Sequence, residues 1–447
     1  MKCWLKWIGG VFAFAVLSVV TLYAASSLRG ATADQRAALA VMEQPGAAPG
    51  RNAFAALWLL PYDIPEAEMD AVADEDVRRF AARVAAAADL AAAAQQASYV
   101  SVAAERYPRQ SEVAEDLPLC HPPATGCLAQ VRAQRDAYRR WRGRNLGLIE
   151  RAGALSQYGH HRGGFAPSLA MPFPPLAEIG STLLTDRALS FVEGRTDEAL
   201  AQVCGDVGTW RRLAPNADSL MVSMVGFGLA GNSTVLFAEM LAELPAGQPL
   251  PPACAIAFAA PTVAEISLCE PLKGEFRFIR TALAQWDGTQ GTAGNPFFSR
   301  AMTDARLAAQ LAQFCGKDVE RALLADRMAP MQLANDRFRL DCVRNYVGCI
   351  LTAIAAPAYH DYLLRAQDYG AKLKLAGTLL WLHEHHADAR PLQARLASRP
   401  DTLRSAIRDI EIVDGGKALQ VAMYGRRPAG HFALPLPAHA RGAASSD

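Results

Sequence analysis

Residues Trp7 to Leu28 form an apolar run that contains no charged side chain. Coiled into an α-helix, a run of this length rises about 33 Å at ~1.5 Å per residue, enough to cross a hydrocarbon core of about 30 Å. Lys2 and Lys6 lie on its amino side, whereas the residues after Arg29 carry mixed charge. Because basic residues next to a span stay in the cytoplasm, we expect a single transmembrane anchor with all later residues outside the cell's inner membrane.

The same run is also compatible with a cleaved signal peptide, since Ala24, Ala25 and Ser26 supply the small residues of a cleavage site. A lipoprotein signal fits less well, because its cysteine follows the apolar run and Cys3 precedes it. A second uncharged stretch, Ser219 to Ala238, raises the alternative of a transport-related protein with two spans. That stretch contains several polar residues, and a second crossing would return the later cysteines to the reducing side of the membrane.

Nine cysteines are present, and Cys3 is expected at the cytoplasmic face. The other eight lie on the exported side, where an oxidising periplasm allows disulfides. No Cys-x-x-Cys spacing occurs, which argues against a zinc ribbon and a thioredoxin-type redox pair. The expected pairs are Cys120–Cys127, Cys254–Cys269, Cys342–Cys349 and, by elimination, Cys204–Cys315. The pair Cys342–Cys349 requires a helix break between residues 345 and 348, because on one unbroken helix the two would be about 10 Å apart.

The charge of the chain is nearly balanced, with 45 basic and 44 acidic residues. Such a balance creates no overall field that would attract nucleic acid, and we expect no nucleic-acid partner. Arginines cover the outer faces of the stretch Leu128 to Tyr158. They indicate one of two things: a surface that binds anionic lipid or an acidic protein, or an ordinary solvated helix face.

Apolar periodicity predicts a mainly α-helical fold, an irregular helical bundle or array of hairpins behind the transmembrane helix. The expected helices are 33–43, 66–96, 128–158, 176–193, 196–213, 218–244, 261–285, 299–314, 318–328 and 357–386. Near the carboxyl end, Asp409 to Val413 and Ala418 to Met423 alternate around Asp414-Gly415-Gly416, which predicts a small β-hairpin. A third strand is expected over Phe432 to Leu436.

These features divide the chain into seven expected regions. They are a cytoplasmic tail (1–6), the anchor (7–28), a stalk rich in proline and glycine (29–51), a helical subdomain (52–158), a body of helical hairpins (159–406), a β-hairpin region (407–437) and a disordered tail (438–447).

The string Gly226-Phe-Gly228-Leu-Ala-Gly231 matches a dinucleotide-binding fingerprint by letters alone. That fingerprint requires a preceding strand and an acidic residue about 20 positions later. Residues 245 to 260 contain no acidic residue. We therefore expect no cofactor here and interpret the glycines as sites of close helix packing.

His383-Glu384-His385-His386 is the densest group of candidate metal ligands, and His360 is a further candidate. The group is not His-Glu-x-x-His, because Ala387 occupies the position of the second histidine. Without a third ligand at a defined spacing we expect no metal site. No Gly-x-Ser-x-Gly, Ser-x-x-Lys or phosphate-binding glycine loop is present, so no catalytic residue is assigned from motifs.

Several short sequence segments resemble those of membrane-anchored, mainly helical periplasmic proteins of proteobacteria that have no assigned activity. They are Asn52-Ala-Phe-x-x-Leu57, Glu193-Gly194 with Glu198-Ala199, Gly274-Glu275-Phe276, and Asn345-Tyr-Val-Gly348 followed by Pro357-x-x-x-x-Tyr362. The resemblance implies placement in the envelope and helical architecture.

Together these features predict a single-pass protein of the bacterial inner membrane with a disulfide-braced periplasmic body. We expect it to bind another macromolecule, for example as an immunity-type protein that protects the envelope, rather than to be an enzyme. The alternative is a periplasmic hydrolase whose site includes His160, His161, His360, His383 or His386.

Overall fold

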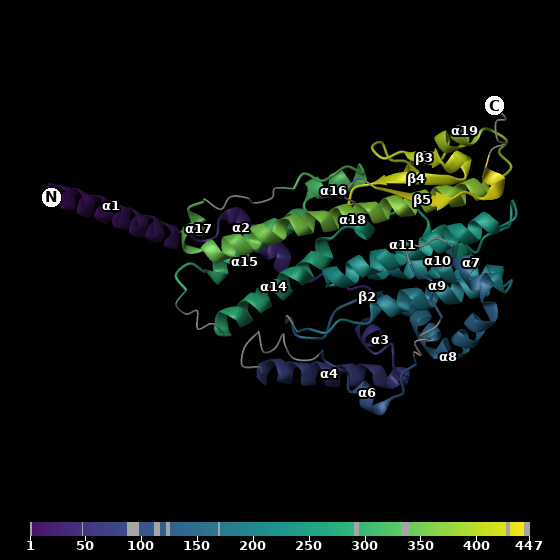
Figure 1. Cartoon of the computed structure of the whole chain (residues 1–447), viewed down its shortest axis with the longest axis horizontal. Helices are drawn as coiled ribbons and strands as arrows, with labels where there is room; N and C mark the ends of the chain where they lie inside the picture. Colours follow the sequence, from purple (N-terminus) through teal and green to yellow (C-terminus); the bar gives the residue numbers. More distant parts are fainter. Residues whose placement is uncertain are drawn as a thin grey trace.

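The computed structural model of the chain describes residues 2–46, 48–86, 98–110, 117–121, 126–168, 170–289, 295–331, 339–425 and 430–441. The fold is mostly helical, with a three-stranded antiparallel sheet near the carboxyl end and one apolar helix that projects from the body at the amino end (Figure 1). The predicted fold class is therefore confirmed.

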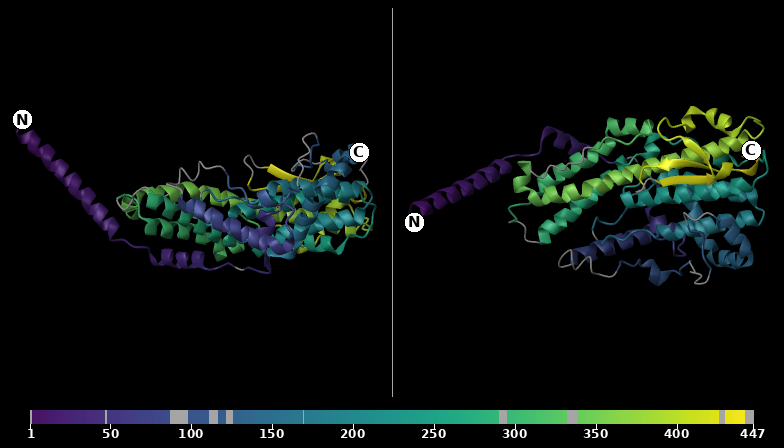
Figure 2. Two further views of the ribbon diagram at one scale, coloured as in Figure 1. Left: turned by 90° about the horizontal axis from the view of Figure 1, so that it is seen from below. Right: turned by 45° about the horizontal axis from the view of Figure 1, so that its top comes forward.

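The projecting helix is α1 (Lys2–Ser27), and both views of Figure 2 show it extending away from the body. Among the described residues, three helices are long and apolar enough to cross a membrane: α1, α11 (Leu220–Glu243) and α18 (Tyr346–Glu384). They differ in burial. Most apolar side chains of α1 are exposed, for example Phe12 (70%) and Phe14 (73%), whereas most of α11 is buried inside the body.

Helix α2 (Ala33–Glu43) has the bounds that the sequence predicts. Thr32 Oγ1 accepts a hydrogen bond from the amide of Gln35, and Gln35 Oε1 accepts one from the amide of Thr32, which forms a capping box. Met42 near the end of α2 is fully buried in the main core. The prediction of a stalk over 29–51 is therefore wrong, because the burial of Met42 fixes this segment against the body.

The main core lies between long helices that run along the body (Figure 1). Helices α9 (Leu176–Val192) and α10 (Thr196–Leu213) form the predicted hairpin, with Gly194 at a φ of 82° in the turn. Helix α11 packs against α9, α10 and α18. The remaining helices of this part are α7 (Cys127–Ala133), α8 (Arg135–Gly153), α12 (Pro252–Ala257), α13 (Val263–Ile266), α14 (Cys269–Thr289), α15 (Arg300–Leu311), α16 (Lys317–Leu324), α17 (Asp341–Arg344) and α19 (Leu392–Ala397).

Two predicted single helices are broken in the structure. The stretch predicted as 128–158 divides at Gln134, whose φ of −131° is not helical, and ends in a 3-10 turn and strand β2 (Tyr158–His160). The stretch predicted as 261–285 divides between α13 and α14. Thr262 starts α13 with its own capping box to Glu265, and Ser267 is extended, so the chain leaves the helical path there.

Helix α18 begins eleven residues before the predicted start at Pro357, which lies inside the helix. Proline removes one helical amide and usually kinks or ends a helix. Pro357 is exposed. The helix nevertheless continues through it, so the proline rule placed the start of this helix wrongly.

A second, smaller hydrophobic cluster forms around α3 (Phe54–Trp58), α4 (Glu66–Ala86) and α6 (Ala103–Arg106). Residues 87–96 of the predicted helix lie outside the described residues. The fully buried Asp76 organises this cluster by accepting hydrogen bonds from Trp58 Nε1 (2.7 Å), Tyr99 Oη (2.9 Å), the Val102 amide (2.9 Å) and Ser101 Oγ. Phe165, in the loop after β2, packs into the same cluster. Strand β2 pairs with β1 (Arg51–Asn52).

The carboxyl-terminal sheet has the order β3 (Ile410–Val413), β4 (Ala418–Met423), β5 (Gly430–Pro435) and lies against α18 and α11 (Figure 1). The predicted hairpin is present, with Val413 opposite Ala418 and positive φ at Asp414, Gly415 and Gly416 in the turn. The third strand is also present. Ala438–Ala440 form a 3-10 turn with Ala440 buried, so residues 438–440 are not part of a disordered tail, and residues 442–447 lie outside the described residues.

Four disulfides are present within the described ranges. Cys120–Cys127 and Cys342–Cys349 occur as expected, and Asn345 interrupts the helix between α17 and α18 as the second pair requires. The pairs Cys254–Cys269 and Cys204–Cys315 were predicted wrongly: the structure contains Cys204–Cys254 and Cys269–Cys315. Packing of α12 on α10 brings Cys254 to Cys204, with 4.9 Å between their Cα atoms. The break before α14 turns Cys269 toward Cys315 instead.

Candidate functional site

A cavity of about 590 Å³ lies between the loop that follows β2, the start of α11, and helices α14 and α15. Its apolar lining residues include Phe54, Phe165, Met171, Pro172, Phe173 and Phe278. Its polar lining residues include His161, Asp218, Arg277, Arg280 and Arg300. Cavities with an apolar wall and a few convergent polar groups are the usual form of small-molecule sites.

Backbone contacts fix His161 and Asp218 side by side. The amide of Asp218 donates to the carbonyl of His161 (3.0 Å), and the amide of His161 donates to the carbonyl of Asn216 (3.3 Å). The amide of Gly163 donates to Asp218 Oδ1 (3.0 Å). Gly274 on α14 makes this arrangement possible, because a Cβ atom there would lie 1.7 Å from the carbonyl oxygen of Asp218.

The buried His161 lies beside the half-buried Asp218. Nδ1 of His161 lies 3.4 Å from Oδ1 of Asp218, and His161 is 4% exposed. Burial by itself would raise the pKa of Asp218, but His161, the Gly163 amide and Arg162 together hold that pKa below its ordinary value. Neither ring nitrogen of His161 has a hydrogen-bond partner among the described residues. A histidine that lies beside a carboxylate and has unpaired ring nitrogens is suited to accept a proton or to bind a polar ligand atom.

Three arginines and one carboxylate, Asp218, line this cavity, and two of the arginines already have carboxylate partners outside the lining. Arg280 contacts Glu43 and, through Nε, Asp304 Oδ2 (3.1 Å), and Arg300 lies 3.9 Å from the same Asp304 oxygen. Arg277 has no ion pair within the part of the chain that the structure describes. Guanidinium groups match carboxylate and phosphate geometry. The cavity is therefore suited to a ligand with an anionic group and an apolar part.

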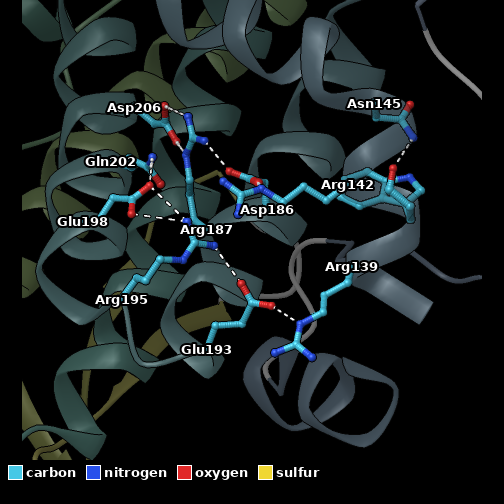
Figure 3. Close-up of polar contacts among 11 residues, drawn as sticks. Arg139, Arg142, Asn145, Asp186, Arg187, Glu193, Arg195, Glu198, Gln202 and Asp206 are labelled. Carbon is cyan, nitrogen blue, oxygen red and sulfur yellow. Dashed lines mark hydrogen bonds and ion pairs between the residues drawn. The ribbon is translucent and has the colours of Figure 1, made fainter. Parts of the chain in front are cut away.

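A second charged cluster lies among α8, α9 and α10 (Figure 3). Buried Arg187 bonds Asp186 (2.6 Å) and Asp206 (3.1 Å), and Arg142 Nε lies 2.7 Å from Asp186. Burial raises the pKa of Asp206 above its ordinary value, against the opposing effect of Arg187. A cavity of about 430 Å³ borders this cluster. Because two guanidinium groups balance two carboxylates here, the cluster leaves no excess charge for a ligand, and its clear effect is to join three helices.

The candidate histidines do not converge on one place. His383 lies near the carboxyl end of α18, and its Nε2 is 2.8 Å from the Gln248 carbonyl. His386 lies beside Gly247. His360 is half-buried on α18, and His160 Nδ1 lies 3.0 Å from the Pro49 carbonyl. Of these histidines, only His161 lines the 590 Å³ cavity. In the described ranges, no three histidine, cysteine or acidic side chains are arranged to hold a metal ion.

The string from Gly226 to Gly231 lies inside α11 and not between a strand and a helix, so it lacks the setting of a dinucleotide site. A Cβ at Gly226 would lie 2.8 Å from Ala214 and 2.9 Å from Trp210. This glycine serves close packing of α11 on α10, as the sequence indicates.

No sequence motif identified Asp218, Arg277, Arg280 or Arg300 as site residues. A signal for two of them exists in α14, where Glu270, Lys273, Arg277 and Arg280 recur at spacings of three and four and so share one helix face. No comparable signal marks Asp218 or Arg300, which reach the cavity only through tertiary packing. In comparisons with known proteins, no family model, curated protein or solved structure matches this chain.

Proposed function

We propose that this protein is a single-pass protein of the bacterial inner membrane whose periplasmic body binds an anionic ligand with an apolar part. Two observations support the placement. The exposed apolar helix α1 precedes the body, and four disulfides suit an oxidising compartment. The macromolecular or immunity-type partner expected from the sequence stays a prediction.

The observation that supports ligand binding is the composition of the 590 Å³ cavity. Arg277 presents a guanidinium without an ion pair among the described residues, in a cavity that aromatic and proline side chains also line. Arg277 is half-buried, and a carboxylate or phosphate group would be stabilised there by charge-assisted hydrogen bonds. The apolar wall would cover the ligand's hydrocarbon part.

Binding can be measured on the full chain in lipid nanodiscs by thermal unfolding and calorimetry, with octanoate and octyl phosphate as probes. Octanamide serves as the uncharged control. We expect the two anions to raise Tm and octanamide to have little effect. Arg277→Gln is expected to weaken anion binding about tenfold, equivalent to ~1.4 kcal/mol. Arg140→Gln, a change on the exposed face of α8, is the matched control. Equal stabilisation by octanoate and octanamide would contradict the proposal.

The second candidate function is hydrolysis, and the His161–Asp218 pair is the observation that favours it. Nε2 of His161 would take a proton from an attacking water or hydroxyl, while Asp218 stabilises the charged ring. A test measures release of p-nitrophenol from octanoate and phosphate esters. An enzyme should lose turnover in His161→Gln while retaining octanoate binding. If the wild type releases p-nitrophenol no faster than His161→Gln, hydrolysis is ruled out.

A further inference from the structure

The end of the body next to α1 carries an exposed apolar surface, which we define as the α1-end patch: Phe297, Tyr346, Leu351 and Ile354. We propose that this patch rests in the outer surface of the same bilayer that α1 crosses, so that the body lies on the membrane. The proposal depends on the membrane anchor and not on ligand binding in the cavity.

The first step is that α1 is fixed to the segments that carry the patch. Tyr23 Oη donates to the carbonyl of Pro296 (2.8 Å), and the ring of Tyr23 meets the ring of Phe297 edge to face, with 6.4 Å between centroids. The amide of Arg344 donates to Ser26 Oγ (3.0 Å), and Ser26 is buried. The end of the anchor is therefore joined to the body directly, without a free linker.

The contact between Tyr23 and Phe297 also determines how deep the patch lies in the membrane. Tyr23 precedes Leu28, the last residue of the apolar run, by more than one helical turn. Its Cα atom consequently lies about 7.5 Å deeper than that of Leu28 at ~1.5 Å rise per residue. Because Phe297 contacts the Tyr23 ring, a membrane that covers Trp7 to Leu28 must also reach Phe297. Aromatic rings at this depth are typical of the interface between lipid and water.

The third step is the character of α18 where it starts. From Tyr346 to Tyr359 the helix has no charged side chain. Its inner face is buried, as at Thr352 and Ala356, yet its outer face exposes Leu351 (42%) and Ile354 (71%). The outer face of a helix in water is normally polar. Apolar side chains on this face are expected where lipid, and not water, covers it.

Charge at the border of the patch also fits a lipid surface. Arg29 and Arg344 are exposed at the junction of α1 and α17, where they can reach phosphate headgroups. Arg300 follows Phe297 by three residues and lines the 590 Å³ cavity. Seating the patch in the bilayer would therefore place the Arg300 end of the cavity close to the headgroups.

The test is nitroxide accessibility in the full chain, reconstituted in nanodiscs that contain lipid and no other protein. Cys3→Ser removes the free thiol, and a label is attached through Ile354→Cys or, as a matched control, through Ile407→Cys, whose native side chain is 60% exposed near the start of the sheet. At position 354 we expect roughly tenfold fewer collisions with a water-soluble nickel reagent than at 407, and more with oxygen, because the hydrocarbon region excludes water.

Nickel collisions at position 354 as frequent as at 407 would overturn the proposal. Protection at 354 in native membranes but not in nanodiscs would also overturn it, in favour of a protein partner. Protection that disappears on dilution of the chain among nanodiscs would instead assign the patch to a second copy. Ile354→Glu provides a readout without a label. It should raise proteolysis at residues 346–358 of the full chain in nanodiscs, because a charged side chain there would keep the patch out of the lipid.

Discussion

Removal of the Asp76 carboxylate should destabilise the smaller hydrophobic cluster selectively. Asp76 accepts from four donors, and its two N–H donors, Trp58 Nε1 and the Val102 amide, belong to residues less than 10% exposed. Asp76→Ala would leave these donors without an acceptor, at a cost of ~1–3 kcal/mol each. Adding the weaker loss at Tyr99 and Ser101, we expect the free energy of unfolding of this cluster to fall by about 3–5 kcal/mol.

Hydrogen exchange measured by mass spectrometry can localise this effect. In Asp76→Ala, peptides that cover residues 98–107 should lose protection, whereas peptides from α10 and α11 should change little. The matched control is Glu75→Ala, the neighbouring carboxylate, whose pairs with Arg79 and Arg106 lie at the surface. Surface ion pairs contribute little to stability. If Glu75→Ala costs as much protection as Asp76→Ala, the assignment of Asp76 as the organising group is refuted.

Three further outcomes follow from the geometry. Gly274→Ala should abolish octanoate binding in calorimetry and lower Tm, because its Cβ would lie 1.7 Å from the Asp218 carbonyl oxygen; unchanged affinity would contradict this. The lowered pKa of Asp218 stabilises the fold above its unfolded pKa of about 3.9, and this contribution is lost as pH falls through the lower folded value. The stability difference between wild type and His161→Asn should therefore be largest at neutral pH and shrink toward pH 2 in denaturation curves. Non-reducing peptide mapping should recover a Cys204–Cys254 peptide, and recovery of Cys254 linked to Cys269 would contradict the structure.

The elements that the sequence predicted well are those set by local chemistry. Thr32 and Gln35 form the capping box that starts α2, and Gly194 at positive φ turns the chain between α9 and α10. The turn dipeptide after Asp414 fixes the hairpin register. In each case the residues that determine the conformation are neighbours in the chain, so the pattern is visible without the fold.

The features that could not be predicted depend on tertiary contacts. Cys254 pairs with Cys204, fifty residues away, because α12 packs on α10, and no spacing rule contains that information. The cavity joins His161, Asp218 and Arg300 from separate segments, and its most specific requirement is the absence of a side chain at Gly274. His161 was one candidate among several histidines, and only the fold distinguishes it from His383.

The placement of the body outside the inner membrane is tested most directly by a topology reporter at the carboxyl end. Alkaline phosphatase, which is active only where its disulfides form, is fused after Asp447, and a fluorescent protein that folds in the cytoplasm is fused at the same position in a parallel chain. A single crossing by α1 predicts high phosphatase activity and no fluorescence. Fluorescence without phosphatase activity would place the carboxyl end in the cytoplasm and contradict the account.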